Sequence, residues 1–229
     1  MITDRVGLRQ PTKQRLLQEG VRLFAEKGFR ETTVGDVEAA AGLEPRRGAL
    51  YRHFQSKEAL LEAALEQHMQ YLGETTAGLD QLPVKDQRQE ALIMGQWLLA
   101  ELDRERAIVR ILEQDGDRLT DLRDRFRQVL IDPGYELTSE LARRWLGSAA
   151  DQLDLQALSA VLLGSLVNYR RSTWTFGATP AGLDDERFLA TWADLCVTTA
   201  AALRRKHSKR PTRVGTSTRP APKQSQSRR

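Results

Sequence analysis

The chain has 229 residues, with 35 Lys and Arg against 31 Asp and Glu, and 40% of its residues are hydrophobic. This length suffices for one large domain or two small ones with an ample core. Cys196 is the single cysteine, which excludes an internal disulfide framework. Because there is neither an N-terminal apolar signal nor an apolar run of about 18 residues, we expect a soluble cytoplasmic protein with no membrane contact.

Charge is distributed unevenly along the chain. Residues 1–57 carry 11 basic and 7 acidic side chains, residues 58–206 carry 17 and 24, and residues 207–229 carry 7 basic and no acidic side chains. The basic excess therefore lies at the two ends. The acidic middle is not expected to wrap nucleic acid by itself.

Residues 12–61 predict three short helices and the start of a fourth. Apolar residues between Leu16 and Ala25 recur at helical spacing, and Gly28 ends this first helix. Thr33, followed three residues later by Asp36, has the pattern of a capping box and begins a second, shorter helix.

A glycine corner follows the second helix. Gly42 allows a sharp turn, and Pro45 suits the first turn of a third helix over residues 45–54. Leu50 and Phe54 are four residues apart and would face inward. The outward side chains of this helix would enter the major groove of DNA; they are Arg46, Arg47, Ala49, Arg52 and His53.

A plainer interpretation makes Gly42 a loop residue of an ordinary helical bundle and the arginines a solvated face. We favour DNA binding because several features occur together and in order. These are the helix lengths, the glycine corner, Tyr51 and the restart at Ser56-Lys57-Glu58.

The same residues carry a family resemblance. The motifs are Leu23-Phe24, Glu26-Lys27-Gly28-Phe29, Thr32-Thr33-Val34, Ala41-Gly42-Leu43, Gly48-Ala49-Leu50-Tyr51, His53-Phe54 and Ser56-Lys57-Glu58-Ala59-Leu60-Leu61. They resemble the N-terminal signature of the TetR family of transcriptional regulators. The resemblance implies an all-α homodimer whose N-terminal helix-turn-helix binds a palindromic operator. It also implies a C-terminal helical domain that binds an effector and dimerises, and most family members are repressors released by a small ligand.

Two departures from the family pattern affect the third helix. Residues 44–47 stand where the family more often has two residues, so this helix should begin about half a turn earlier. Ala49 also replaces the threonine or serine frequently found there. The resemblance also implies phosphate contacts at Thr33, Tyr51 and Lys57. These residues lie in unaltered parts of the motif, and phosphate contacts position the protein without reading sequence. The DNA-binding candidates are Thr33, Arg46, Arg47, Ala49, Tyr51, Arg52, His53 and Lys57.

Beyond this unit the sequence predicts more helices and no strands. Periodic apolar segments cover residues 56–72, 85–102, 105–114, 119–131, 134–146, 155–176 and 185–206. Breaks are expected at Pro83, Gly116, Pro133 and Gly147, and between Gly177 and Gly182. The predicted fold is all-α with about nine to ten helices. It divides into a helix-turn-helix DNA-binding domain (1–55), an effector-binding and dimerisation domain (56–206) and a disordered basic tail (207–229), whose composition suits DNA contact and mere solubilisation equally.

The last two long helices carry apolar stripes wider than one core requires. We expect both to pair with their symmetry mates in a four-helix bundle, with Ala160 and Gly164 allowing close helix approach. The alternative is that both stripes are buried within the monomer. The stripes are Leu155, Leu158, Val161, Leu162, Ser165, Leu166 and Tyr169, and Phe188, Leu189, Trp192, Leu195, Cys196, Thr199 and Leu203.

An effector pocket is expected among the helices between residues 79 and 176, in the interior that members of this family hollow out. Each candidate is also an ordinary core residue. The abundance of Trp, Leu and Met favours an apolar or aromatic molecule, whereas Arg170-Arg171 could meet an acidic group. The candidate lining residues are Met94, Trp97, Ile111, Phe126, Tyr135, Asn168, Tyr169, Thr173 and Trp174.

Catalysis has little support in the sequence. His53, His68 and His207 are too scattered for a metal site or a nucleophile with its base, and no phosphate-binding glycine loop or Gly-x-Ser-x-Gly turn occurs. We therefore expect no catalytic residue, no metal and no cofactor. The alternatives to a repressor are an activator of the same fold and, less favoured, a helical protein that coats DNA nonspecifically.

Overall fold

The computed structural model describes residues 10–79 and 86–208; the expected break at Pro83 and almost all of the basic tail lie outside these residues. Within them the chain forms eight α-helices and no strand. The all-α prediction is confirmed, with fewer helices than the nine to ten expected. In the same part of the chain, no helix is long and apolar enough to cross a membrane.

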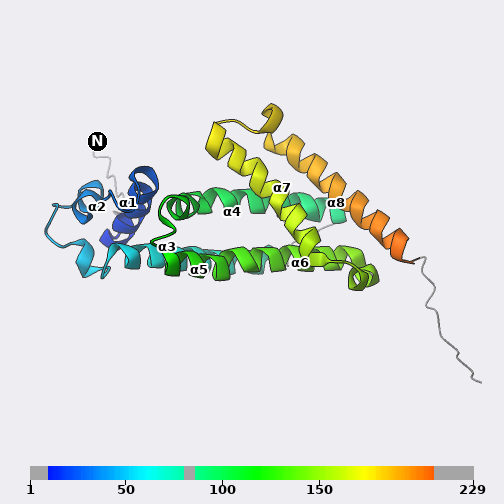
Figure 1. Cartoon of the computed structure of the whole chain (residues 1–229), viewed down its shortest axis with the longest axis horizontal. Helices are drawn as coiled ribbons and strands as arrows, with labels where there is room; N and C mark the ends of the chain where they lie inside the picture. The colour runs from blue at the N-terminus through cyan, green and yellow to red at the C-terminus, as the bar shows by residue number, and fades with distance from the viewer. Residues whose placement is uncertain (1–9, 80–85, 209–229) are drawn as a thin grey trace, which may run out of the picture.

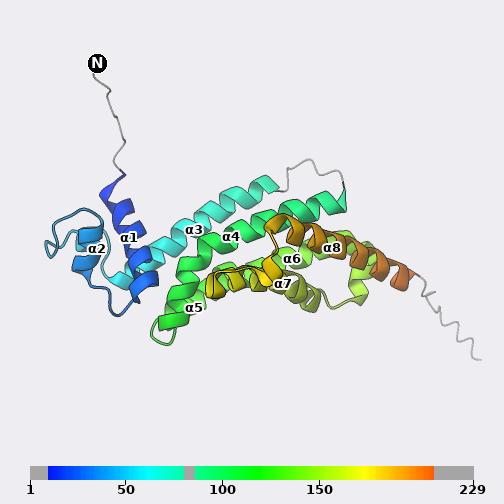
Figure 2. The same ribbon diagram turned by 90° about the horizontal axis from the view of Figure 1, so that it is seen from above.

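The helices form an N-terminal head and an elongated body (Figure 1). The head contains α1 (Thr12–Lys27) and α2 (Val34–Ala40), followed by a single 3-10 turn, Leu50–Arg52. From the head, α3 (Lys57–Leu79) runs out along the body, and α4 (Gln87–Asp115) returns towards it (Figure 2).

Four further helices complete the body. The short α5 (Thr120–Phe126) and α6 (Asp132–Leu146) follow each other in line, away from the head. Helix α7 (Leu155–Phe176) then crosses the body and packs on α6 and α4. Helix α8 (Asp185–Ser208) packs on α4 and ends far from the head (Figure 1).

Two apolar cores stabilise this arrangement, and α4 contributes to both. The first core joins the head to α3, α5 and the last part of α4, where Ile108 and Ile111 are buried. The second joins the first part of α4, including Met94 and Leu98, to α6, α7 and α8. The head therefore shares its core with three helices of the body.

Two predicted helices, 85–102 and 105–114, are in fact the single helix α4. The stretch between them contains neither Gly nor Pro, so nothing interrupts the backbone hydrogen bonds. The apolar periodicity changes phase there because the helix passes from one core to the other.

The break expected at Pro133 is also wrong. The chain stays helical through a π turn, Arg127–Ile131, and directly enters α6. Proline has no backbone N–H to donate. In the π turn just before it, the N–H of Asp132 donates to the carbonyl of Arg127, and the chain stays helical.

The third helix expected over residues 45–54 is absent as an α-helix. Arg46 and Gly48 have φ angles of 65° and 69°, which lie in the left-handed region and cannot occur within a right-handed helix. Only Leu50–Arg52 makes a helical turn. Leu50 and Phe54 are nevertheless buried, as the sequence predicts.

Candidate nucleic-acid interface

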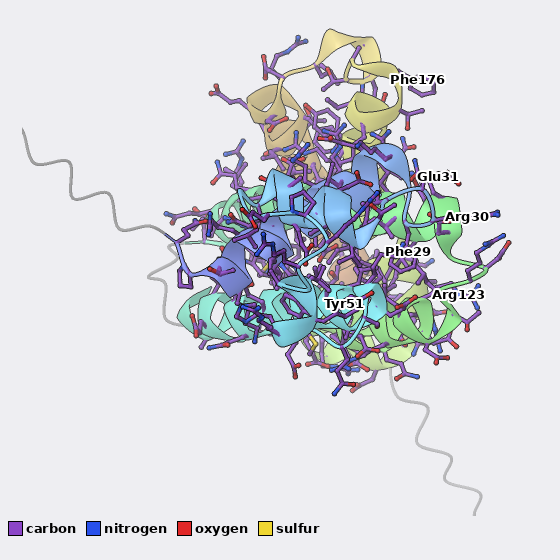
Figure 3. The ribbon with its side chains drawn as sticks, turned by 90° about the vertical axis from the view of Figure 1, so that its left-hand side faces the viewer. Phe29, Arg30, Glu31, Tyr51, Arg123 and Phe176 are labelled. Carbon is purple, nitrogen blue, oxygen red and sulfur yellow. The ribbon has the colours of Figure 1, made fainter. Side chains whose placement is uncertain are left out.

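The segment between α2 and α3, residues 41–56, presents most of the predicted DNA-binding side chains. Arg46, Arg47, Arg52 and His53 are exposed, and Tyr51 is 60% exposed. Ala49 is half-buried beneath them. In the end-on view of the head (Figure 3), Tyr51 lies below the turn formed by Phe29, Arg30 and Glu31.

Arg47 is held only weakly. Its Nε atom lies 2.7 Å from an Oε2 carboxylate oxygen of Glu44, and both side chains are about three-quarters exposed. Such surface ion pairs contribute roughly 0 to 1 kcal/mol. The guanidinium of Arg47 is therefore free to exchange Glu44 for another acceptor.

A buried carboxylate lies under this segment. Glu38 of α2 is fully buried, and its two oxygens accept the backbone N–H groups of Arg46 (2.7 Å) and Leu50 (3.0 Å). A left-handed conformation at a non-glycine residue such as Arg46 costs about 1–2 kcal/mol. The charge-assisted hydrogen bond from Arg46 to Glu38 helps to offset that cost.

Thr33 caps α2 with the predicted capping box. Its hydroxyl oxygen accepts the N–H of Asp36 at 3.1 Å, while the Asp36 carboxylate accepts both the N–H and the O–H of Thr33. These hydrogen bonds lower the pKa of Asp36. The polar groups of Thr33 are thus hydrogen-bonded within the capping box, while its side chain stays at the surface.

Lys57 begins α3 and turns its ammonium inward. The Nζ atom donates to the carbonyls of Phe29 (2.7 Å) and Thr32 (2.8 Å) and lies 4.4 Å from the centre of the Phe29 ring. Burial lowers the pKa of Lys57. Its side chain therefore holds the α1–α2 turn, whereas the sequence suggests a phosphate contact for it.

The N–H of Phe29 is held from the body. It donates to the Oδ2 atom of Asp115, the last residue of α4, at 2.9 Å. The peptide groups on either side of Phe29 thus join the head to the first residue of α3 and the last residue of α4. We call this set, Phe29, Lys57 and Asp115, the Phe29 clamp.

Comparison with known proteins agrees with the geometry of the head. A family model described as bacterial regulatory proteins, tetR family, matches residues 16–64. The N-terminal part of the chain is therefore similar to the TetR family of bacterial regulatory proteins.

Two curated relatives of this chain carry the name of repressors. A probable acrEF/envCD operon repressor of Escherichia coli (strain K12) is 32% identical over 111 residues, 44% of this chain and 46% of the relative. The repressor KstR2 of Mycolicibacterium smegmatis is 33% identical over 116 residues, 49% and 55% respectively. The chain spans about half the length of these two relatives.

Solved structures agree on the fold. The fatty acid degradation regulator FadR from Bacillus halodurans superimposes with a TM-score of 0.61, covering 82% of this chain and 95% of its own, at 17% identity. At that identity the likeness extends to the fold alone.

The nine expected effector residues do not line one cavity. Met94 and Tyr169 are buried in the body core, whereas Ile111 and Phe126 belong to the core shared with the head. Tyr135 is 37% exposed and Asn168 is exposed as well. Helical spacing predicts that these residues lie on apolar faces of their helices, but it does not predict which of the two cores each face enters.

The remaining three members of the set are Trp97 on α4 and Thr173 and Trp174 on α7. Trp97 and Thr173 each have a buried polar atom, Nε1 and Oγ1 respectively, without a hydrogen-bond partner. Trp174 donates from Nε1 to Asp103 at 3.3 Å and lines an open depression of about 270 Å³. Arg106, Arg110 and Arg171 line the same depression.

Tyr169 and Cys196 serve the core. The Tyr169 ring stacks on Phe188 at 3.9 Å, and its hydroxyl donates to Asp185 at 2.9 Å. Burial, with the bond to Asp185, raises the pKa of Tyr169 to about 12, and burial raises that of the Cys196 thiol to about 12. Neither group is ionised near neutral pH, which agrees with a structural role for the thiol.

Sequence reasoning missed Glu38 and Asp115. An acidic residue between Val37 and Ala39, next to the apolar face of α2, was the available signal for Glu38. Asp115 stood at a predicted helix end and carried no sign of its contact with Phe29, 86 positions away.

Replacing Lys57 tests the inward role of its ammonium. We predict that Lys57→Met lowers the free energy of unfolding by about 1–3 kcal/mol, because two carbonyls lose a charged donor. Urea denaturation measures this change. The control Lys27→Met removes an exposed lysine of the same head and should change stability by less than about 0.5 kcal/mol. Equal effects of the two substitutions would contradict the inward role.

Proposed function

We propose that the protein is a homodimeric transcriptional repressor that binds a palindromic operator and is released by a small-molecule effector. The observation that carries the proposal is the exposed group of Arg46, Arg47, Arg52 and His53 beside Tyr51, on a head that the TetR family model matches. The names of the two repressor relatives add support for repression. The family is one of regulatory proteins, and we infer no enzymatic activity.

DNA contact would use the segment between α2 and α3. Arg46, Arg47 and Arg52 supply forked donors that match guanine edges and phosphates. The hydroxyl of Tyr51 suits a phosphate contact that positions the head without reading sequence. Thr33 and Lys57 would support these contacts by shaping the head.

The dimer would form through α7 and α8. Half of the residues in the predicted stripes are buried within the monomer, but Val161 is 68% exposed and Leu195 is 58% exposed. Ala160 is exposed and Gly164 half-buried, and nothing would contact a Cβ atom at Gly164. Exposed apolar and small side chains on two neighbouring helices suit a two-fold helical bundle.

The effector would bind between α4 and α7. Trp97 Nε1 and Thr173 Oγ1 are buried without a hydrogen-bond partner, and unpartnered buried polar atoms are costly unless a ligand or water meets them. An apolar or aromatic molecule whose polar group met one of these atoms would satisfy it and could pack its apolar part against the helix faces.

Helix α4 would carry the signal. It bears Trp97 in its first half and ends at Asp115 in the Phe29 clamp. An effector that displaces α4 would therefore move the head and change the spacing of the two heads of a dimer. Linkage requires operator DNA to weaken the binding of that effector by the same factor.

Two alternatives keep the same head. An activator of the same fold would select one operator in the same way. Expression of a reporter gene under that operator would then rise, whereas a repressor would lower it. A protein that coats DNA nonspecifically would select no sequence at all.

Operator selection tests the proposed function. From random double-stranded DNA, the protein should enrich one palindrome, because two related heads read two half-sites. Arg47→Ala should flatten the preference at one position of each half-site by about 1–3 kcal/mol if Arg47 reads a guanine. Tyr51→Phe should weaken all sequences alike. If selection enriches no sequence, specific operator binding is excluded.

Charge placed on the exposed face of α8 tests the dimer. We predict that Leu195→Asp raises the dimer dissociation constant by at least about tenfold, because the carboxylate would be buried in the interface. Val161→Asp should do the same on α7. Gln70→Asp, which adds the same charge on an exposed position of α3, should leave the mass measured by sedimentation unchanged. Dimers that persist in both α7 and α8 variants would place the interface elsewhere.

A further inference from the structure

Glu38 is the one fully buried carboxylate that contacts the DNA-facing segment among the described residues. Its Oε2 atom accepts the N–H of Arg46 at 2.7 Å, and its Oε1 atom accepts the N–H of Leu50 at 3.0 Å. A single side chain of α2 thus binds the backbone at two points, one on each side of Arg47, Gly48 and Ala49.

The backbone between these points has little regular structure of its own. Gly42, Arg46 and Gly48 have φ angles of 70°, 65° and 69°, so no continuous right-handed helix forms before the 3-10 turn. The N–H groups of Arg46 and Leu50 would otherwise have no helical partner. The conformation of the segment therefore depends on an acceptor that another element supplies.

The segment also packs against the start of α2. A Cβ atom placed on Gly35 would lie 3.7 Å from Cγ of Arg46 and 3.8 Å from Cβ of Pro45. The stem of Arg46 therefore lies along α2 while its guanidinium is exposed. Helix α2 therefore determines the position of the backbone that carries Arg46 and Arg47.

We propose that Glu38 is a positioning residue for DNA reading: it fixes residues 44–50 in one conformation and thereby determines which base edges Arg46 and Arg47 meet. This inference rests on the proposed function. It explains how a segment without an α-helix can still present its arginines at defined positions, because flexible arginines would contact phosphates of any sequence.

Glutamate suits this task better than its neutral analogue. An ionised carboxylate has two acceptor oxygens and no donor, so it can accept two N–H groups at once. Glutamine has the same shape, but one of its two terminal atoms donates. In Glu38→Gln one of the two backbone N–H groups must therefore lose its acceptor.

The experiment compares Glu38→Gln with Glu62→Gln in the full-length protein. Glu62 is an exposed residue of α3, so the control removes the same charge from outside the segment. Amide hydrogen exchange on the free protein reports the segment's mobility. Selection from random double-stranded DNA reports base preference.

In Glu38→Gln we expect the amides of Arg46 and Leu50 to exchange about tenfold faster or more, with α1 and α8 unchanged. The preference at the positions read by Arg46 and Arg47 should flatten by about tenfold, and nonspecific affinity should remain within about twofold. Glu62→Gln should match the wild type in both measurements.

Unchanged exchange and an unchanged preference profile in Glu38→Gln would overturn the proposal. If Glu38→Gln does not fold, Glu38→Asp replaces it in both measurements. A carboxylate one methylene shorter cannot reach both N–H groups, so a wild-type preference profile in Glu38→Asp would also overturn the proposal. A wild-type protein that selects no sequence would refute the proposed function, whereas the exchange result on the free protein tests the role of Glu38 separately.

Discussion

Two charged side chains hold the peptide groups on either side of Phe29, and the attachment of the head depends on them. The N–H of Phe29 donates to Asp115 at the end of α4, and its carbonyl accepts from Lys57 at the start of α3. Lys57 also reaches Thr32, so the whole α1–α2 turn is held. Charge-assisted hydrogen bonds that are partly buried are stronger than neutral ones, and these lie where the head meets α3 and α4 of the body.

Helix α4 connects this attachment to the far part of the body. It has 29 residues and is therefore about 43 Å long. One part packs with α6, α7 and α8, and the other packs with the head, α3 and α5. Because one continuous helix belongs to both cores, a displacement of α4 in the body would be transmitted to the head. This continuity would let the proposed effector, bound between α4 and α7, change the position of the head.

Local signals in the sequence predicted local structure well. Gly28 ends α1, Thr33 and Asp36 form the capping box, and Leu50 and Phe54 are buried, each because the cause lies within a few residues. The third helix was wrong because a distant acceptor, Glu38, stabilises a non-helical backbone. The effector set was scattered because helical spacing identifies an apolar face but not the core that the face enters. The Phe29–Asp115 bond joins positions far apart in sequence and left no local pattern.

Hydrogen exchange at the backbone amide of Phe29 tests the attachment most directly. If the Phe29 clamp joins head and body, this amide should exchange only in the opening that also exposes Leu16 and Phe24 of the head core. Asp115→Ala should then speed its exchange by about tenfold or more, while the amides of α7 and α8 keep their rates. An amide of Phe29 that exchanges as fast in the wild type as in Asp115→Ala would show that the clamp does not hold the head in solution.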